Sequence, residues 1–342
     1  MVLVTGVIVA AVAVLHPGPS KVVAQPAATQ PAPTPSPAAP PAQPLVAPVS
    51  GLAPAAAFPA DLPGSPPATQ PAVPVATTEP ATQPAGDLSA QLTAGLKLLG
   101  SGKVIEGRAA LSKLYFNYYA QLAPQDAQAI RDTLSSVNQK LLFGPKVTPG
   151  DPLCAYYQFQ AGDVLGKIAW RYKIPYHLIE QINHVDARHI WVGRRLKVIN
   201  GPFDAIVHKS EFRIDVYLKD AAGHPIYATS FPVGLGKSNS TPVGLWIVAP
   251  GGKVANPGWT DPNTNRYYPP TDPNVPIGKF WMALQGVDDA TRNKHGYGIH
   301  GTIDPNSIGK EMSLGCIRLR ADDIAQLFRL LVERYSTVQV VP

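Results

Sequence analysis

The chain has 342 residues, a formal net charge of +6 and two cysteines, Cys154 and Cys316. That length is enough for two or three domains, and the charge is uneven, since the segment before residue 87 has a net charge of −1. The basic remainder suits an anionic polymer or a membrane surface as partner. We expect no nucleic-acid partner, because no nucleic-acid motif accompanies the charge.

Residues 1–24 are predicted to be a signal peptide or membrane anchor. The first 15 residues are almost wholly apolar but too short for a comfortable membrane span, and small residues precede Gln25. No Lys or Arg precedes the apolar run, so a late start and a shortened anchor both remain open. Either case predicts export to the cell envelope or periplasm, with an inner-membrane tether as one option. A buried N-terminal helix of a cytosolic protein fits poorly with the sequence that follows.

Residues 25–86 are predicted to be a disordered Pro/Ala-rich linker. Residues 17–86 hold 20 of the 38 prolines, and the element Ala-Thr-Gln-Pro-Ala occurs three times among them. Such a composition cannot build a core, and it favours extended polyproline II conformations. About seventy residues of this kind could span up to roughly 200 Å.

Residues 87–145 are predicted to be a short helical region of three helices. Asp87 suits a helix N-cap, Pro124 suits the first position of a helix, and Gly144-Pro145 suits a helix end. Apolar residues recur at helical spacing in all three segments, and we interpret these stripes as core. The pattern assigns no function to this region.

Residues 153–200 show the pattern of a small βααβ unit. A short strand leads to a turn at Gly162-Asp163, helices follow over 164–172 and 176–183, and a strand closes the unit at 195–199.

This segment resembles a LysM domain over nearly its full length. The matching positions include Tyr157, Gly162-Asp163, Leu165, Asn183 and Gly193. LysM modules bind glycans that contain N-acetylglucosamine. The resemblance therefore implies that this unit contacts peptidoglycan glycan strands, with Gly162, Asp163 and Asn183 as candidate glycan-binding residues.

Residues 203–342 are predicted to form a mostly-β domain with one late helix. Apolar residues from Phe212 to Leu218 alternate with Arg213, Asp215, Tyr217 and Lys219, which predicts a half-buried strand. A helix from Asp322 to about Arg334 and a closing strand at 337–341 complete the domain. The long polar stretch 251–276 suggests a lid over a site.

The strongest chemical signal is Gly298-Ile299-His300-Gly301-Thr302, followed by Ser313-Leu314-Gly315-Cys316-Ile317-Arg318. A cysteine near a histidine has the ingredients of a thiolate nucleophile with its base. Gly315 leaves room for a substrate carbonyl and lets backbone N–H groups face an oxyanion. An isolated cysteine is more often a small buried hydrophobic residue, but this pattern is long and specific.

These two elements resemble the L,D-transpeptidase (YkuD-type) family, and the resemblance covers essentially all of 203–342, including Ser240-Thr241-Pro242-Val243-Gly244. It implies Cys316 as nucleophile and His300 as general base and acid. Leu314, Gly315, Ser313 and Gly301 are the residues expected to form an oxyanion hole or shape the site, and Arg318 is a candidate for binding substrate. Many relatives have His where Leu314 stands, so only a backbone role is expected there. The group that orients His300 is left open, with a backbone carbonyl as one option.

The predicted fold is therefore multidomain α+β: a Pro-rich linker, a short helical region, a LysM domain and a mostly-β YkuD-type catalytic domain. The implied substrate is a peptidoglycan stem tetrapeptide, from which D-Ala is released as a Cys316 thioester passes its acyl group to an amine. We expect no cofactor. We also expect no metal, because His295, His300 and Cys316 match no common zinc spacing.

Three alternatives remain open. Water could be the acceptor, which would make the protein an L,D-carboxypeptidase. The chain could also be a non-catalytic peptidoglycan-binding scaffold or a cytosolic thiol hydrolase. The acceptor amine and the oligomeric state are not assigned. Cys154 is expected to be a structural or incidental thiol, since a disulfide with Cys316 would disable the nucleophile.

Overall fold

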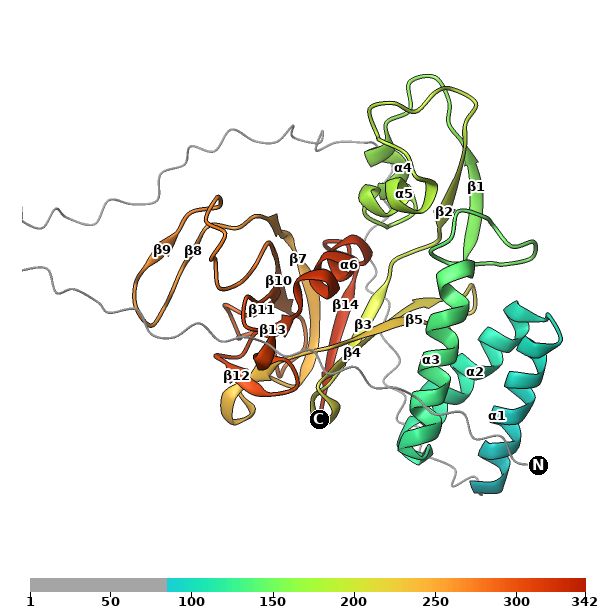
Figure 1. Ribbon diagram of the computed structural model, residues 1–342, viewed down its shortest axis with the longest axis horizontal. Helices are drawn as coiled ribbons and strands as arrows, with labels where there is room; N and C mark the ends of the chain where they lie inside the picture. The colour runs from blue at the N-terminus through green and yellow to red at the C-terminus, as the bar shows by residue number, and fades with distance from the viewer. Residues whose placement is uncertain (1–84) are drawn as a thin grey trace, which may run out of the picture. The chain divides into compact units, whose positions relative to one another are not determined.

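The computed structural model describes residues 85–342. The predictions for 1–24, and for the linker apart from its last two residues, lie outside this range. Within it, a helical segment leads to a small βααβ LysM unit and then to a β-rich catalytic domain with a curled sheet, as the sequence predicted (Figure 1). No helix of the described part is both long and apolar enough to cross a membrane.

The helical segment consists of α1 (Ala85–Gly100), α2 (Val104–Tyr118) and α3 (Pro124–Leu141). α1 begins two residues before Asp87, which lies in the first turn of the helix and is not its N-cap. Pro124 takes the first helical position of α3, where its missing N–H costs nothing. The apolar stripes pack inward around a cluster that includes Leu111, Ile130 and Leu134.

The LysM unit pairs β1 (Cys154–Gln158) antiparallel with β2 (Arg195–Ile199), and α4 (Leu165–Arg171) and α5 (Tyr176–Asn183) lie between them in sequence. Its buried residues are continuous with those of the β-rich domain in one core cluster. The predicted elements of this unit are confirmed to within one residue.

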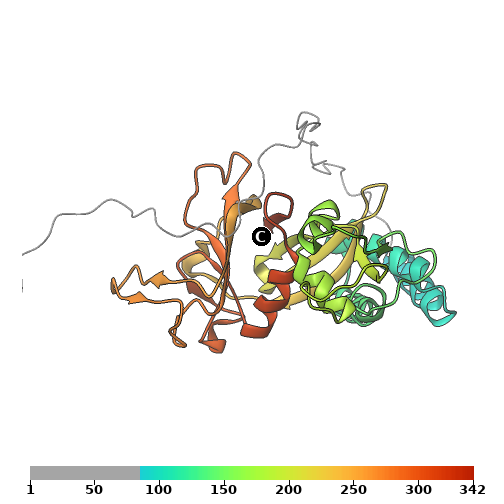
Figure 2. The same ribbon diagram turned by 90° about the horizontal axis from the view of Figure 1, so that it is seen from above.

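The β-rich domain is built on an eight-stranded sheet. The strands, in their order across the sheet, are β13 (Ile317–Leu319), β11 (Gly298–Gly301), β10 (Phe280–Gly286), β7 (Gly244–Ala255), β14 (Thr337–Val341), β3 (Asp204–His208), β4 (Arg213–Lys219) and β5 (Pro225–Pro232). Two smaller pairs lie outside it: β6 (Leu235–Gly236) with β12 (Glu311–Ser313), and β8 (Trp259–Thr260) with β9 (Tyr267–Tyr268). The β8–β9 hairpin projects from the sheet on the side away from α1–α3 in both views (Figures 1 and 2).

The late helix, α6 (Ala321–Leu330), ends four residues before the predicted end at Arg334. The chain is already extended at Leu331. Lys253, which is half-buried on β7, donates from Nζ to the carbonyls of Phe328 and Leu331, each at 2.6 Å. A lysine ammonium satisfies carbonyls that a helix end leaves unpaired, and it interacts favourably with the helix dipole there. Lys253 therefore caps the C-terminal end of α6 at a position where the sequence itself shows no signal for a helix end.

The prediction that β4 is exposed on one face is wrong for the first half of the strand, whereas Tyr217 is half-buried and Lys219 exposed, as predicted. Asp215 is fully buried and Arg213 nearly so. The carboxylate of Asp215 accepts a hydrogen bond from the Tyr115 hydroxyl at 2.6 Å and pairs with Arg213, while His208 Nε2 lies 3.1 Å away. Tyr115 belongs to α2, so the helical segment covers the first half of the face that the alternation assigned to solvent. Residues 87–145 thus form a cover for this end of the sheet.

Candidate active site

The pairing of β11 with β13 brings the predicted catalytic residues together. The two strands run parallel with Ile299 opposite Ile317 and His300 opposite Arg318, and Cys316 directly precedes β13. Because side chains alternate along a strand, His300, Cys316 and Arg318 lie on one face. Ile299 and Ile317 lie on the other face and are buried in the core.

His300 has a defined tautomer. Its Nδ1 lies 2.6 Å from the carbonyl oxygen of Gly301. A carbonyl can only accept, so Nδ1 carries the proton and Nε2 keeps its lone pair for a substrate or thiol proton. The ring stacks on Trp281 of the neighbouring strand, with 5.6 Å between centroids and 20° between planes. The orienting group that the sequence left open is thus the carbonyl of Gly301.

Burial lowers the pKa of His300 to about 4. Only 5% of the residue is exposed, and the nearby charge of Arg318 acts in the same direction. The hydrogen bonds to the carbonyls of Gly301 and Ile277 favour the charged form but do not outweigh burial. At neutral pH the imidazole is therefore neutral and can accept a proton.

Burial also raises the pKa of the Cys316 thiol, against the opposing effects of the Gly298 backbone N–H and the Arg318 charge. The thiol points its hydrogen toward the carbonyl of Gly296, with 3.7 Å from Sγ to the oxygen. Cys316 and His300 are thus both neutral at neutral pH, which fits a thiol whose proton is removed during attack.

Both cysteines are free, so no disulfide disables Cys316. Cys154 is buried in the LysM unit, where burial raises its thiol pKa to about 11. A thiol of that kind is inert at neutral pH.

The turn before Cys316 depends on Ser313 and Gly315. The Ser313 hydroxyl donates to the carbonyl of Cys316 at 2.7 Å and accepts from the Gly315 N–H at 3.1 Å. Ser313 therefore shapes the turn, and the Gly315 N–H is engaged within it. This leaves the N–H groups of Leu314 and Cys316 as the candidates for an oxyanion hole. Leu314 itself is 64% exposed.

Gly315 needs to be glycine on two counts. Its φ is +137°, in the region that residues with a Cβ avoid. A Cβ at this position would also lie 2.6 Å from Cε1 of Tyr297. Gly301 is less constrained, since a Cβ there would lie 3.2 Å from Cγ2 of Ile324 on α6. Its contribution to the site is the carbonyl that holds His300.

Arg318 keeps unused hydrogen-bonding capacity. Its backbone is fixed to Gly234 by two hydrogen bonds of 2.8 Å, while its side-chain Nε is buried with no hydrogen-bond partner among the described residues. An unpartnered guanidinium donor beside a nucleophile suits a carboxylate or carbonyl oxygen of a ligand.

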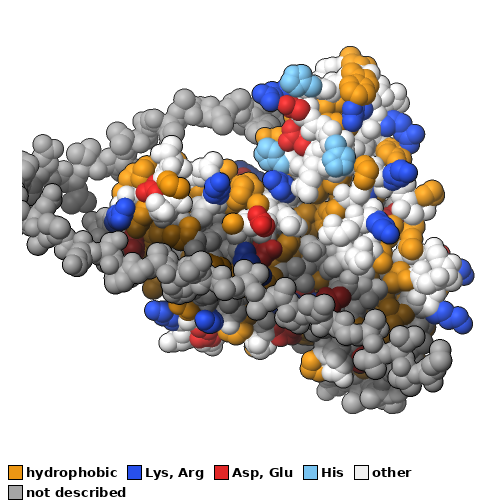
Figure 3. All heavy atoms as spheres, viewed as in Figure 1, with side chains coloured by type: hydrophobic (Ala, Val, Ile, Leu, Met, Phe, Trp, Pro, Cys, Tyr) orange, Lys and Arg blue, Asp and Glu red, His pale blue; other side chains and the backbone are white. Residues whose placement is uncertain are grey.

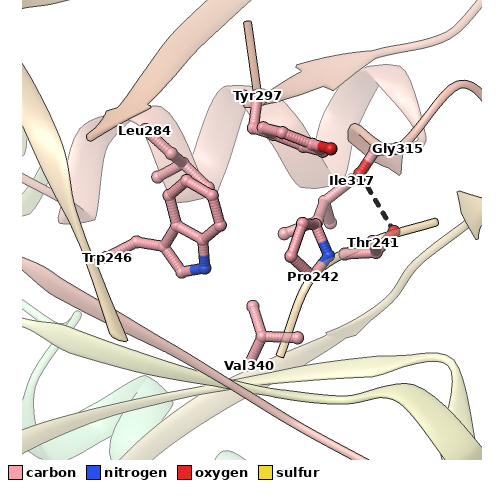
Figure 4. Close-up of a pocket in the computed structure, with 9 residues that line it drawn as sticks. Thr241, Pro242, Trp246, Leu284, Tyr297, Gly315, Ile317 and Val340 are labelled. Carbon is pink, nitrogen blue, oxygen red and sulfur yellow. Dashed lines mark hydrogen bonds between the residues drawn. The ribbon is translucent and has the colours of Figure 1, made fainter. Parts of the chain in front are cut away.

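The sequence did not assign a role to Thr241. Its hydroxyl donates to the carbonyl of Gly315 at 2.9 Å, and it lines a small apolar hollow beside the turn together with Pro242, Trp246 and Tyr297 (Figure 4). The only signal was the motif Ser240–Gly244, which carried the family resemblance without a chemical reason.

The glycan-binding candidates of the LysM unit serve its fold. Asp163 accepts hydrogen bonds from the Tyr157 hydroxyl (2.7 Å) and the Gln160 N–H (2.8 Å). The Asn183 side chain donates to the carbonyls of Ile179 and Lys197 and accepts from the Lys197 N–H. Gly162 takes a positive φ of 83° in the turn. Glycan contact by the two polar side chains stays a prediction, and their polar groups are already engaged.

The charge of the described residues is not concentrated on the face that Figure 3 shows. Lys and Arg side chains are spread over the helical, LysM and catalytic parts of that face. Among residues 85–342, no group of three or more His, Cys, Asp or Glu side chains could hold a metal ion.

Comparison with known families agrees with this geometry. The model of the L,D-transpeptidase catalytic domain, YkuD, matches residues 202–340, and the LysM model matches residues 157–198. Residues 202–340 are a YkuD-type L,D-transpeptidase catalytic domain, preceded by a LysM domain. L,D-transpeptidases are cysteine-dependent acyltransferases, and these two domains together imply a peptidoglycan substrate in the cell envelope.

Two sequence relatives belong to the same family. The chain is 28% identical over 175 residues to the L,D-transpeptidase YkuD of Bacillus subtilis. The aligned region covers 50% of this chain and 90% of that protein. It is 31% identical to the L,D-transpeptidase ErfK/SrfK of Escherichia coli, over 36% of this chain and 39% of that protein. A solved L,D-transpeptidase from Mycobacterium smegmatis has a TM-score of 0.30 at 16% identity, covering 44% of this chain and 65% of that one.

Proposed function

We propose that this L,D-transpeptidase acts on the stem tetrapeptide of peptidoglycan. Cys316 attacks the carbonyl that precedes the terminal D-Ala, a carbon–sulfur bond forms, and the carbonyl electron pair moves to oxygen. Collapse of this intermediate releases D-Ala and leaves a thioester. An amine then attacks the thioester, which returns the thiol and forms a new amide.

His300 is the general base and acid of this cycle. Nε2 takes the thiol proton during attack, gives it to the departing amino group of D-Ala, and later accepts a proton from the acceptor amine. The N–H groups of Leu314 and Cys316 stabilise the oxyanion, and Arg318 binds a carboxylate or carbonyl of the stem. The β8–β9 hairpin, within the stretch 251–276, acts as a lid over the bound peptide.

One observation carries this proposal: strand pairing places a neutral imidazole of fixed tautomer and a free cysteine on one face of β11 and β13. The LysM domain supports it, because a module that holds glycan strands raises the local concentration of stem peptides. We place the protein outside the inner membrane, with the N-terminal segment as signal or tether and the Pro-rich segment as spacer.

The test uses the full chain with a disaccharide-tetrapeptide and mass spectrometry of the products. We expect loss of D-Ala and formation of a cross-linked dimer. Cys316→Ala should abolish both, whereas Cys154→Ala, which removes the other thiol, should leave both intact. Release of D-Ala with tripeptide as the only product, even when an amine acceptor is added, would identify a carboxypeptidase. No Cys316-dependent change in a folded protein would contradict the proposal and favour a scaffold.

A further inference from the structure

Thr241 connects two segments that are far apart in the sequence. Only 2% of this residue is exposed. Its Oγ1 accepts a hydrogen bond from the N–H of Gly236, at the end of β6, and donates one to the carbonyl of Gly315, both at 2.9 Å. The second bond is the dashed line in Figure 4. A single hydroxyl thus connects β6 with the turn that carries Cys316.

The backbones around this hydroxyl are in direct contact. A Cβ on Gly236 would lie 2.7 Å from Cα of Gly315 and 2.9 Å from the backbone nitrogen of Thr241, so no side chain fits there. Ser313 pairs with Gly236 across β12 and β6. The reactive turn is therefore held at Ser313 by strand pairing and at Gly315 by Thr241.

The segment that carries Thr241 is itself held in place by hydrogen bonds to its backbone. The buried Lys209 donates from Nζ to the carbonyls of Thr241 and Asn239. The Asn239 N–H donates to a carboxylate oxygen of Glu311 at 3.1 Å. Ser238 and Asn239 have positive φ values of 50° and 62°, which non-glycine residues adopt at a cost unless their surroundings hold them. These bonds limit how far Thr241 can move from Gly315.

The carbonyl of Gly315 and the N–H of Cys316 belong to one peptide unit. Because that unit is planar and trans, the two groups point in opposite directions. A donor that fixes the carbonyl therefore also fixes the direction of the N–H, and it polarises the N–H as a hydrogen-bond donor.

We propose that Thr241 is a positioning residue for acyl transfer: its hydroxyl aims the Cys316 N–H at the oxyanion that forms on the substrate carbonyl. The proposal rests on the proposed function. As Sγ bonds to the carbonyl carbon, the electron pair of the C=O bond moves to oxygen, and the aimed N–H meets that charge. Thr241 contacts neither the thiol nor the substrate and acts only through the Gly315–Cys316 peptide.

The test compares Thr241→Val with Thr241→Ser in the full chain. Valine keeps the shape and removes the hydroxyl, so kcat for D-Ala release from a disaccharide-tetrapeptide should fall about 10- to 100-fold with little change in KM. Serine keeps the hydroxyl and should retain near wild-type kcat. Alkylation of Cys316 by iodoacetamide forms no oxyanion, so its rate should stay within about 2-fold in both variants.

Thr291→Val is the matched control. Thr291 is also fully buried, and its hydroxyl donates to the Leu245 carbonyl at 2.7 Å, away from the reactive turn. The kcat of Thr291→Val, measured per folded molecule, should match wild type.

If Thr241→Val does not fold, Lys209→Met provides the second variant. It removes the hydrogen bond to the Thr241 carbonyl, and it should lower kcat by a smaller factor and leave the alkylation rate unchanged. A wild-type kcat in Thr241→Val, or in Lys209→Met where that variant is needed, would overturn the proposal. So would kcat and alkylation falling together.

Amide hydrogen exchange gives a readout that does not depend on turnover. We expect faster exchange over residues 311–319 in Thr241→Val and not in Thr291→Val. Unchanged exchange in Thr241→Val would overturn the anchoring of the peptide. If the wild-type protein releases no D-Ala while Thr241→Val still exchanges faster, the proposed function fails and the anchoring is supported.

Discussion

The Nδ1 of His300 donates to the carbonyl of Gly301, the next residue in the chain, over 2.6 Å. The imidazole is therefore oriented by its own strand, and no carboxylate is needed to fix its tautomer. A carbonyl stabilises the imidazolium less than a carboxylate would, which fits a pKa that burial holds at about 4. This relationship determines how activity and stability should depend on pH.

The first prediction concerns the pH dependence of activity. The proposed active form has a neutral imidazole and a protonated thiol, so kcat/KM for D-Ala release should fall on the acid side with a midpoint near pH 4 rather than near 6.5. Iodoacetamide alkylation follows the thiolate, and its midpoint should lie above that of an ordinary cysteine because burial raises the pKa of Cys316. An acid limb near 6.5 together with rapid alkylation at pH 6 would indicate a thiolate–imidazolium pair instead.

The second prediction concerns stability. The pKa of His300 is about 4 in the folded protein and about 6.5 in the unfolded chain, so the unfolded chain binds more protons between these values. The free energy of unfolding should therefore fall as pH falls from about 6.5 to 4, by about 3 kcal/mol from this residue alone.

His300→Gln isolates that contribution, since glutamine does not titrate. The free energy of unfolding of both proteins is measured with denaturant at pH 7 and at pH 4. The value for wild type minus that for the variant should be smaller at pH 4 by about 3 kcal/mol. The same difference at both pH values would show that the imidazole titrates alike in the folded and unfolded protein.

The third prediction concerns Gly315. Gly315→Ala forces a Cβ to within 2.6 Å of Tyr297 at a φ of +137°, so the reactive turn must shift. We expect D-Ala release to fall at least about 100-fold, because small displacements of reacting groups cost that much. Gly223→Ala is the control: Gly223 also has positive φ, +85°, but a Cβ there meets nothing within 4 Å. The control should lose about 1 kcal/mol of stability and keep its activity. Equal activities would rule out the steric account.

Local pattern predicted much of the fold and the proximity of His300 and Cys316. The strands at 195–199 and 337–341 follow apolar patterning alone, and the short separation of His300 and Cys316 allowed them to be placed in one site. The burial of Asp215 could not be predicted, because it depends on the docking of α2, whose Tyr115 lies 100 residues away. The contact of Thr241 with the reactive turn could not be predicted for the same reason, since its hydroxyl bonds to a carbonyl 74 residues later. Every residue type has a backbone carbonyl, so a hydrogen bond to one cannot be recognised from the residue types in the sequence.

The last prediction concerns a buried ion pair that connects α2 with the segment leading into the LysM domain. Arg108 contacts both carboxylate oxygens of Asp151, at 2.6 and 3.0 Å, and both side chains are almost fully buried. Asp151 also accepts from the N–H of Leu153, next to β1. Arg108→Met leaves a carboxylate buried without its partner, so it should lower the free energy of unfolding by about 3–5 kcal/mol in chemical denaturation.

The exposed pair Arg188–Asp186 provides the matched control. Its contacts are similar, and the shorter N···O distance is 2.7 Å. Arg188→Met should leave stability unchanged within error, because water solvates both partners of an exposed pair. Adding Asp151→Asn to Arg108→Met removes the uncompensated charge and should restore part of the loss. If Arg108→Met and Arg188→Met cost the same, the buried pair does not stabilise the connection between the helical segment and the LysM domain.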